Sequence, residues 1–267
     1  MTTYSLAYLT TRELDPDQAV EVAAETGYQM VGLRLLPAGT EGPFAIMTDK
    51  ALQARTKAAL ASTGIQLADI EIVRVNHSFE LERFKPFLEL GAELGAKHVL
   101  AAGDDLERER LIQNYGAFCE LAQSFGMSAD LEPMPWTAVK HVRDAIEVTS
   151  AAGFSNAAVL IDALHFDRSD SSLDDLRAIA PERINYIQIC DGPHIENPTF
   201  EQLIYNARTE RFLPGDGDID IASMLRALPR EKVISIEIPR GGWEQKLTAK
   251  VRAEQALERT KALIDSL

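Results

Sequence analysis

The stretch DPDQAVEVAAETGYQMVGLRLL (15–36) contains one complete unit of the pattern that decides the fold. Asp15 is a good helix N-cap, Pro16 suits a first helical turn, and apolar residues recur at helical spacing until Gly27, a typical helix stop. The apolar segment 30–36 follows at once and is typical of a buried strand. We therefore predict a helix that leads directly into a strand.

The same order recurs along the chain. Helical segments end at Gly64, Gly95, Gly126 and Gly153, each followed by an apolar segment. The predicted strands are 4–10, 30–36, 66–75, 98–103, 127–134, 156–164, 184–190 and 233–238. Strands that alternate with helices pair in parallel through right-handed crossovers, and eight such units in 267 residues favour a closed ring. We predict an α/β fold, a (β/α)8 TIM barrel that forms a single domain over residues 1–267.

The alternative is an open, doubly wound parallel sheet. That fold binds dinucleotides through a glycine-rich turn after its first strand. Here the corresponding stretch is LTTRELDP (9–16), which contains no glycine. The longest irregular stretch, 192–218, lies between the last two predicted strands and does not have the composition of a linker. The barrel is the simpler interpretation.

Charge and cysteine content limit the classes of partner. The chain has 27 Lys and Arg against 41 Asp and Glu, a net charge of −14, which disfavours nucleic acid and anionic membranes. Cys119 and Cys190 lie in a predicted helix and a predicted strand, so a disulfide framework has no support. No stretch reaches the roughly 18 apolar residues of a membrane span. We expect a cytoplasmic protein with neither nucleic acid nor membrane as partner; the sequence allows a homo-oligomer.

Polar residues end the last four predicted strands. In AVLIDALHF (158–166), an apolar run leads into Asp162, and a buried carboxylate costs several kcal/mol unless a cation or donor compensates it. Glu132, Gln188 and Glu237 hold corresponding positions. Strand ends surround the mouth of a barrel, and side-chain alternation allows all four to face inward. Three carboxylates and an amide are suitable ligands for a hard divalent metal ion.

This order of Glu, Asp, Gln and Glu, with the Asp-x-x-His of Asp162 and His165, resembles the sugar phosphate isomerase/epimerase group of xylose-isomerase-like TIM barrels. The resemblance covers essentially the whole chain. It implies one divalent ion (Mn²⁺, Mg²⁺ or Co²⁺) held by Glu132, Asp162, Gln188 and Glu237. It further implies that Glu132 and Glu237 carry protons and that His165 contacts a substrate oxygen.

The resemblance implies several activities. The first is isomerisation or epimerisation of a small polyhydroxy ketone or aldehyde through an enediolate. The group's 3-epimerases have histidine at the position of Gln188, whereas hydroxypyruvate isomerase and some dehydratases have glutamine, so a dehydratase of the 3-dehydroshikimate or inosose type stays open. A non-catalytic sugar-binding barrel is a third possibility. The endonuclease IV class, which needs a zinc cluster, is disfavoured because the chain has only five histidines.

Three aromatic or imidazole residues are candidates for substrate contact, and a fourth is not. His165 lies just past the sixth predicted strand, where an imidazole can bind substrate or act as acid or base. His77 follows the third strand and is expected at the mouth, and Trp136 is expected to wall the pocket. His98 begins a strand, at the opposite end of the barrel, and is expected to have no role.

Several arginines are candidates for an anionic group. Arg34 and Glu71 lie on the second and third strands, where they form either an ion-pair network or an anchor for substrate. Arg208 and Arg211 can reach over the mouth to a carboxylate or phosphate. They precede LPGDGDID (213–220), whose glycines we interpret as a turn and a helix cap, because its aspartates would repel phosphate.

Overall fold

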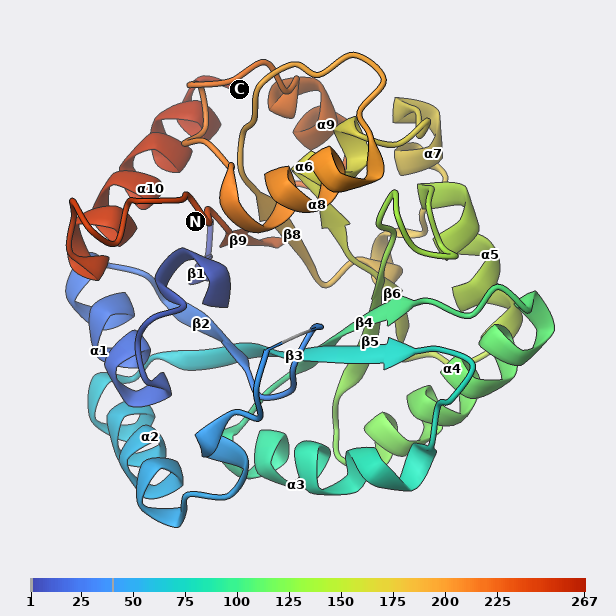
Figure 1. Cartoon of the computed structure of the whole chain (residues 1–267), viewed down its shortest axis with the longest axis horizontal. Helices are drawn as coiled ribbons and strands as arrows, with labels where there is room; N and C mark the ends of the chain where they lie inside the picture. The colour runs from blue at the N-terminus through green and yellow to red at the C-terminus, as the bar shows by residue number, and fades with distance from the viewer. Residues whose placement is uncertain (1, 40) are drawn as a thin grey trace.

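The computed structural model describes residues 2–39 and 41–267 and has a parallel barrel inside a ring of helices (Figure 1). The strand order among these residues is β6-β5-β4-β3-β2-β1-β9-β8-β7. The strands are β1 (Tyr4–Leu6), β2 (Met30–Arg34), β3 (Gln66–Val75), β4 (His98–Gly103), β5 (Ser128–Glu132), β6 (Ala157–Val159), β7 (Ile161–Asp162), β8 (Tyr186–Ile189) and β9 (Val233–Ile236). The predicted (β/α)8 barrel is confirmed.

The ring closes through one interrupted strand. The predicted sixth strand is divided into β6 and β7, with Leu160 between them. β6 pairs with β5, and β7 pairs with β8. The amide of Leu160 donates to the carbonyl oxygen of Leu131 at 3.1 Å, so the backbone stays bonded to its neighbour across the interruption. β6 and β7 together therefore occupy the position of one of the eight strands of the barrel.

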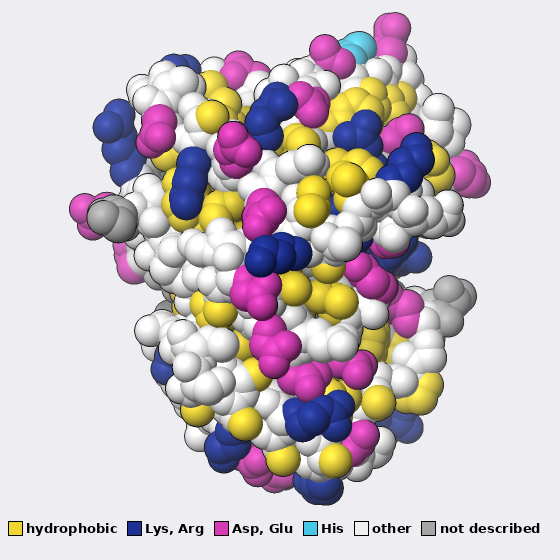
Figure 2. Space-filling view, turned by 90° about the vertical axis from the view of Figure 1, so that its left-hand side faces the viewer, with side chains coloured by type: hydrophobic (Ala, Val, Ile, Leu, Met, Phe, Trp, Pro, Cys, Tyr) yellow, Lys and Arg dark blue, Asp and Glu magenta, His cyan; other side chains and the backbone are white. Residues whose placement is uncertain are grey.

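The helices form the outer layer around this ring (Figure 1). They are α1 (Pro16–Thr26), α2 (Lys50–Thr63), α3 (Lys85–Leu94), α4 (Arg108–Ser124), α5 (Val142–Ala152), α6 (Ala163–Asp167), α7 (Leu173–Arg177), α8 (Phe200–Thr209), α9 (Ile221–Ala227) and α10 (Ala249–Asp265), with 3₁₀ helices η1 (Tyr8–Thr11), η2 (Ala45–Met47), η3 (Leu81–Phe84) and η4 (Pro181–Arg183). On the face in Figure 2, acidic and basic side chains are interspersed with hydrophobic ones. Among the described residues, none of the helices has the length and apolar content of a membrane span.

The helix boundaries follow the predicted signals. Helix α1 begins with a capping box between Asp15 and Gln18 and has Pro16 in its first turn. It ends at Gly27, which has φ 89°, a left-handed conformation that glycine adopts without a Cβ clash. Gly64, Gly95 and Gly153 also follow their helices directly, and Gly126 lies one residue further on, after Phe125.

Two predicted boundaries were wrong. The strand predicted over 4–10 ends at Leu6, because Thr10 turns back to the last strand: its hydroxyl donates to the carbonyl oxygen of Ile236 at 2.8 Å and accepts from the amide of Ile238 at 2.9 Å. The stretch 192–218 is not irregular throughout, since it contains α8. That helix begins with a capping box between Thr199 and Gln202, a local signal that the sequence does contain.

At the end opposite the mouth, the interior of the barrel contains polar side chains that hydrogen-bond to one another. Asp130 accepts from the side-chain amide of Asn185 at 2.8 Å and from the hydroxyl of Ser128. His98 begins β4, its Nδ1 lies 2.7 Å from the same Ser128 hydroxyl, and its ring stacks on Tyr186. His98 therefore belongs to the end of the barrel opposite the mouth, as predicted.

Asp191, just after β8, organises the turn at 213–220. Its Oδ1 accepts from the amides of Gly192 (2.8 Å) and Ile219 (3.1 Å), and its Oδ2 accepts from those of Gly215 (2.9 Å) and Gly217 (3.0 Å). Asp191 is 1% exposed. The glycine-rich stretch is thus a turn, as predicted, and its amides hold a carboxylate that the chain itself provides.

Replacing Asp191 with alanine should lower the free energy of unfolding by about 3–5 kcal/mol, because four backbone amides, two of them in buried hydrogen bonds, lose their acceptor together. Chemical denaturation of D191A and of wild type measures the difference. Asp216→Ala, at an exposed position in the same turn, is the control and should change stability by less than about 1 kcal/mol. Equal stability of D191A and wild type would contradict the organising role of Asp191.

Candidate metal centre

The four predicted ligands come from neighbouring strand ends. Glu132 is the last residue of β5, Asp162 the last of β7, Gln188 lies in β8, and Glu237 directly follows β9. Asp162 pairs in register with Gln188, and Gln188 with Ser235, two residues before Glu237. All four side chains are buried, with exposed fractions of 1–4%. The barrel therefore carries all four to its mouth.

Glu132, Asp162 and His165 form the tightest group. Each offers a ligand atom within 4.8 Å of the others. His165 Nε2 lies 3.8 Å from Glu132 Oε1, and its Nδ1 lies 3.8 Å from Asp162 Oδ1. The backbone amide of His165 donates to Asp162 Oδ1 at 3.0 Å, because Asp162 caps the short helix α6. The Asp-x-x-His spacing thus fixes the aspartate and the histidine against each other.

The amide of Gln188 is the clearest sign of a missing partner. Both its Oε1 and its Nε2 are buried and have no hydrogen-bond partner among residues 2–39 and 41–267. A buried amide without a partner costs about 1–3 kcal/mol, so such groups are rare in folded proteins. An oxygen ligand beside three carboxylates is what a hard divalent cation requires. The donor set fits such an ion.

Arg211 lies among the buried carboxylates of the site. We predicted that it reaches over the mouth, but its side chain is 1% exposed. Nη1 donates to Asp162 Oδ2 at 2.6 Å, and Nη2 lies 3.0 Å from Glu237 Oε2. Nε donates to the carbonyl oxygen of Ala207 at 2.9 Å. Arg211 thereby joins Glu237 to the group formed by Glu132, Asp162 and His165.

The contacts of Arg211 leave oxygens available to an ion. On Asp162, Arg211 contacts Oδ2, whereas Oδ1 lies on the side of His165. Three carboxylates and one guanidinium carry a formal charge of −2, which one divalent ion would neutralise. Arg211 and a divalent ion can therefore share these carboxylates.

The pKa values reflect this excess of negative charge. Burial raises the pKa of Glu132 well above its ordinary value, and the charges of Asp162 and Glu237 raise it further. Burial raises the pKa of Glu237 to about 7 against the opposing effect of Arg211. Burial would also raise the pKa of Asp162, but Arg211 and His165 lower it below its ordinary value. Burial lowers the pKa of His165 to about 4, so this imidazole is neutral at pH 7.

The candidate metal centre borders a cavity at the mouth of the barrel. Among its lining residues are Glu132, His165, Arg211 and Glu237, together with four predicted substrate-binding residues, Arg34, Glu71, Trp136 and Arg208. The Trp136 ring meets the His165 ring edge-on, with centroids 4.8 Å apart. His77 is not among the lining residues. It is exposed beyond the end of β3, with Nε2 3.4 Å from the hydroxyl of Ser78.

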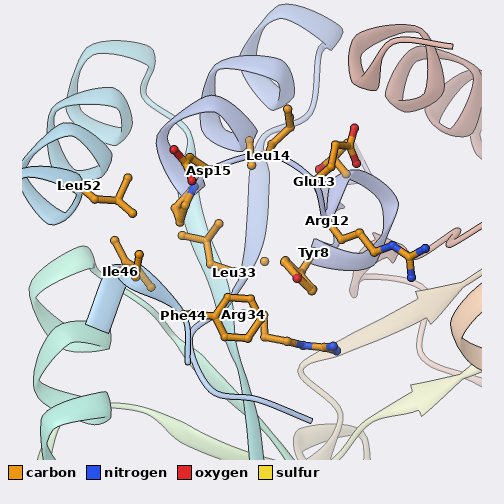
Figure 3. Close-up of a pocket in the computed structure, with 15 residues that line it drawn as sticks. Tyr8, Arg12, Glu13, Leu14, Asp15, Leu33, Arg34, Phe44, Ile46 and Leu52 are labelled. Atoms are coloured by element: carbon orange, nitrogen blue, oxygen red, sulfur yellow. The ribbon is translucent and has the colours of Figure 1, made fainter. Parts of the chain in front are cut away.

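Arg34 and Glu71 form an ion-pair network on the wall of this cavity. Arg34 Nη2 lies 2.5 Å from Glu71 Oε2, and Nη1 lies 3.1 Å from Glu41 Oε1. Its guanidinium also covers the ring of Tyr8 at 4.7 Å. Figure 3 shows a neighbouring cavity, whose lining includes Tyr8, Arg34 and Phe44 together with further apolar and charged side chains. Arg34 thus separates the two cavities with its charge compensated.

The stability of the metal-free protein should depend on pH through Glu237. Its folded-state pKa of about 7 lies above the ordinary 4.5, so its contribution to stability is largest below pH 4.5 and is lost as the pH rises through 7. The free energy of unfolding of wild type minus that of Glu237→Gln should therefore fall by on the order of 3 kcal/mol from pH 4.5 to 8. Denaturant titrations measure it, and the subtraction cancels the opposite contribution of His165. A difference that does not change with pH would show that Glu237 titrates normally.

Comparison with known proteins agrees with this geometry. Residues 20–263 match the family model described as xylose isomerase-like TIM barrel. Inosose isomerase of Bacillus velezensis is 27% identical over 197 residues, which cover 69% of this chain and 68% of that protein. The solved structure of the IolI protein with a bound zinc atom has a TM-score of 0.82 at 19% identity, covering 99% of both chains.

A third similar protein is the probable 3-DHS dehydratase AsbF of Bacillus anthracis, with a TM-score of 0.77 at 16% identity over 97% of this chain and 99% of that one. At such identities the structural matches establish the fold, while the family model covers most of the chain. The resemblance inferred from the strand-end residues is confirmed. The chain belongs to the xylose isomerase-like TIM barrel family, and it is an enzyme of that family.

Proposed function

We propose that the protein is a divalent-metal-dependent isomerase or epimerase that acts on a small polyhydroxy ketone or aldehyde. The observation that carries this proposal is the buried, unpartnered amide of Gln188 beside three buried carboxylates at the barrel mouth. The name of the Bacillus velezensis relative, inosose isomerase, supports a cyclic polyhydroxy ketone as the first substrate to test.

Glu132, Asp162, Gln188 and Glu237 would hold the ion, with Mn²⁺, Mg²⁺ and Co²⁺ as candidates. When bound, a divalent ion supplies Lewis acidity to the substrate carbonyl and so makes the adjacent C–H more acidic. Arg211 has a positioning role, because it fixes one oxygen each of Asp162 and Glu237. The remaining oxygens are thus oriented before any ligand arrives.

Glu237 and Glu132 are the proposed proton carriers. Burial raises the pKa of Glu237 to about 7 in the metal-free protein, so this carboxylate holds a proton more readily than an exposed glutamate does. The pKa of Glu132 is raised by the same burial, so it too can hold a proton. One residue would remove a proton from the substrate to give an enediolate, and the other would protonate the neighbouring carbon.

His165 is suited to hydrogen bonding with a substrate oxygen. It is neutral at pH 7, it lines the cavity, and its Nδ1 has no partner in the described part of the chain. The Trp136 ring, edge-on at 4.8 Å, limits rotation of the imidazole. A neutral imidazole can donate to a carbonyl or hydroxyl without adding charge to the site.

Replacing Gln188 with leucine should separate metal binding from folding. The substitution removes a buried amide that lacks a partner, so the metal-free protein should unfold with equal or greater free energy, by up to about 1–3 kcal/mol. Loss of an oxygen ligand should weaken Mn²⁺ binding at least about tenfold. Denaturation without metal and calorimetric titration with Mn²⁺ measure the two effects. Wild-type Mn²⁺ affinity in Q188L would remove Gln188 from the ligand set.

Replacing Glu237 with glutamine should reduce kcat at least about 10³-fold, because this carboxylate is a proton carrier and a metal ligand. The assay incubates Mn²⁺-loaded protein with inosose in D₂O. Deuterium at carbon in an isomerised product supports the proposal, whereas a dehydrated, conjugated product would assign the protein to the dehydratases. Glu258→Gln, at an exposed position on α10, is the control and should retain activity. Full activity of E237Q would contradict the assigned role.

A further inference from the structure

Four arginines line the mouth cavity of a chain whose net charge is −14. They are Arg34, Arg74, Arg208 and Arg211. A cluster of cations on an acidic protein needs a reason, which is either internal pairing or an anionic ligand. The partners of each guanidinium distinguish these two reasons.

Three of the four are paired internally. Arg34 contacts Glu71 and Glu41, and Arg211 contacts Asp162 and Glu237. Arg74 Nη2 lies 2.7 Å from Asp104 Oδ1, and its Nη1 donates to the carbonyl oxygen of Ala38 at 3.4 Å. Each of these guanidinium groups therefore has a carboxylate in direct contact.

Arg208 differs from the other three. Its guanidinium makes no hydrogen bond or ion pair with any residue of 2–39 or 41–267, and the residue is exposed while it lines the cavity. A Cβ at Gly39 would lie 3.6 Å from Arg208 Nη2, so the guanidinium lies close to the backbone after β2. A guanidinium has five donors in a fixed fork that matches carboxylate and phosphate oxygens. Arg208 offers this fork to the cavity.

The backbone of Arg208 is fixed at the rim. It lies in the last turn of α8, which crosses the mouth in Figure 1. The carbonyl oxygen of Arg208 accepts from Arg12 Nη1 at 3.0 Å, and that of Ala207 accepts from Arg211 Nε at 2.9 Å. The paired Arg211 and the unpaired Arg208 are therefore both held at the C-terminal end of α8.

We propose that the substrate carries an anionic oxyacid group, a carboxylate or a phosphate, and that Arg208 binds this group at the rim. The proposal rests on the proposed function, because the hydroxyketone end of the same molecule would lie among Glu132, His165 and Glu237. Both sets of residues line one cavity, so one small molecule can contact them together. The uncompensated charge of Arg208 also attracts an anion locally, whereas the remainder of the acidic surface repels it.

Three hydroxyketones on one carbon skeleton test this proposal: dihydroxyacetone is neutral, hydroxypyruvate has a carboxylate, and dihydroxyacetone phosphate has a phosphate. Calorimetric titration into Mn²⁺-loaded wild type should show at least tenfold tighter binding of one of the two anions than of dihydroxyacetone, and the preference should weaken at high salt. The anion that binds more tightly identifies the source of the charge.

Arg208→Gln should remove that preference and leave the affinity for dihydroxyacetone within about twofold. Arg230→Gln, an exposed arginine that does not line the mouth cavity, is the matched control and should keep the preference. Equal binding of the three probes, no binding of any of them, or a preference that survives in R208Q would overturn the proposal.

A separate titration with Mn²⁺ alone distinguishes this proposal from the proposed function. If Mn²⁺ does not bind, the metal-dependent function fails, and the three probes are then compared on the metal-free protein. An anion preference that disappears in R208Q supports the role of Arg208 there, and equal binding or no binding overturns it. If Mn²⁺ binds and the preference is absent, only the anionic substrate class is wrong.

Discussion

The contact of Arg211 with Asp162 and Glu237 is the interaction on which the mouth of this barrel depends. Burial raises the pKa values of Glu132 and Glu237, and the negative charges of the neighbouring carboxylates raise them further. One guanidinium removes part of the excess charge and orients one oxygen of each carboxylate that it contacts. It also fixes α8 through the carbonyl oxygen of Ala207. Arg211 therefore contributes both to the charge balance of the site and to the position of α8.

The features that could be predicted from the sequence are those set by local periodicity. Helix caps, terminal glycines and apolar strands lie close together in the chain, so they identify the barrel and the residues that end its strands. Glu132, Asp162, Gln188 and Glu237 follow from this because strand alternation and a closed ring determine where strand ends point. The same local logic explains the turn at 213–220.

The features that could not be predicted depend on long-range geometry. Arg211 lies on a long connection, and whether its side chain hangs over the mouth or enters it depends on contacts with Asp162, 49 positions away. His77 is two residues past β3, whose ten residues run beyond the rim, so this histidine points into solvent. The residues of β3 were predicted correctly, but the sequence pattern does not show how far this strand extends past the mouth of the barrel. Helix α8 was missed despite a capping box at Thr199, because 192–218 was interpreted as a single irregular stretch.

The carboxylate of Asp191 has a consequence for ligand choice. In many TIM barrels, backbone amides in the loops after the seventh and eighth barrel strands, next to a short helix, bind the phosphate of a substrate. Here the corresponding amides precede the short helix α9 and already donate to the carboxylate of Asp191, which belongs to the chain itself. A phosphorylated molecule could use these amides only by displacing the carboxylate of Asp191, so the usual phosphate-binding position of such barrels is closed to phosphate esters in this chain.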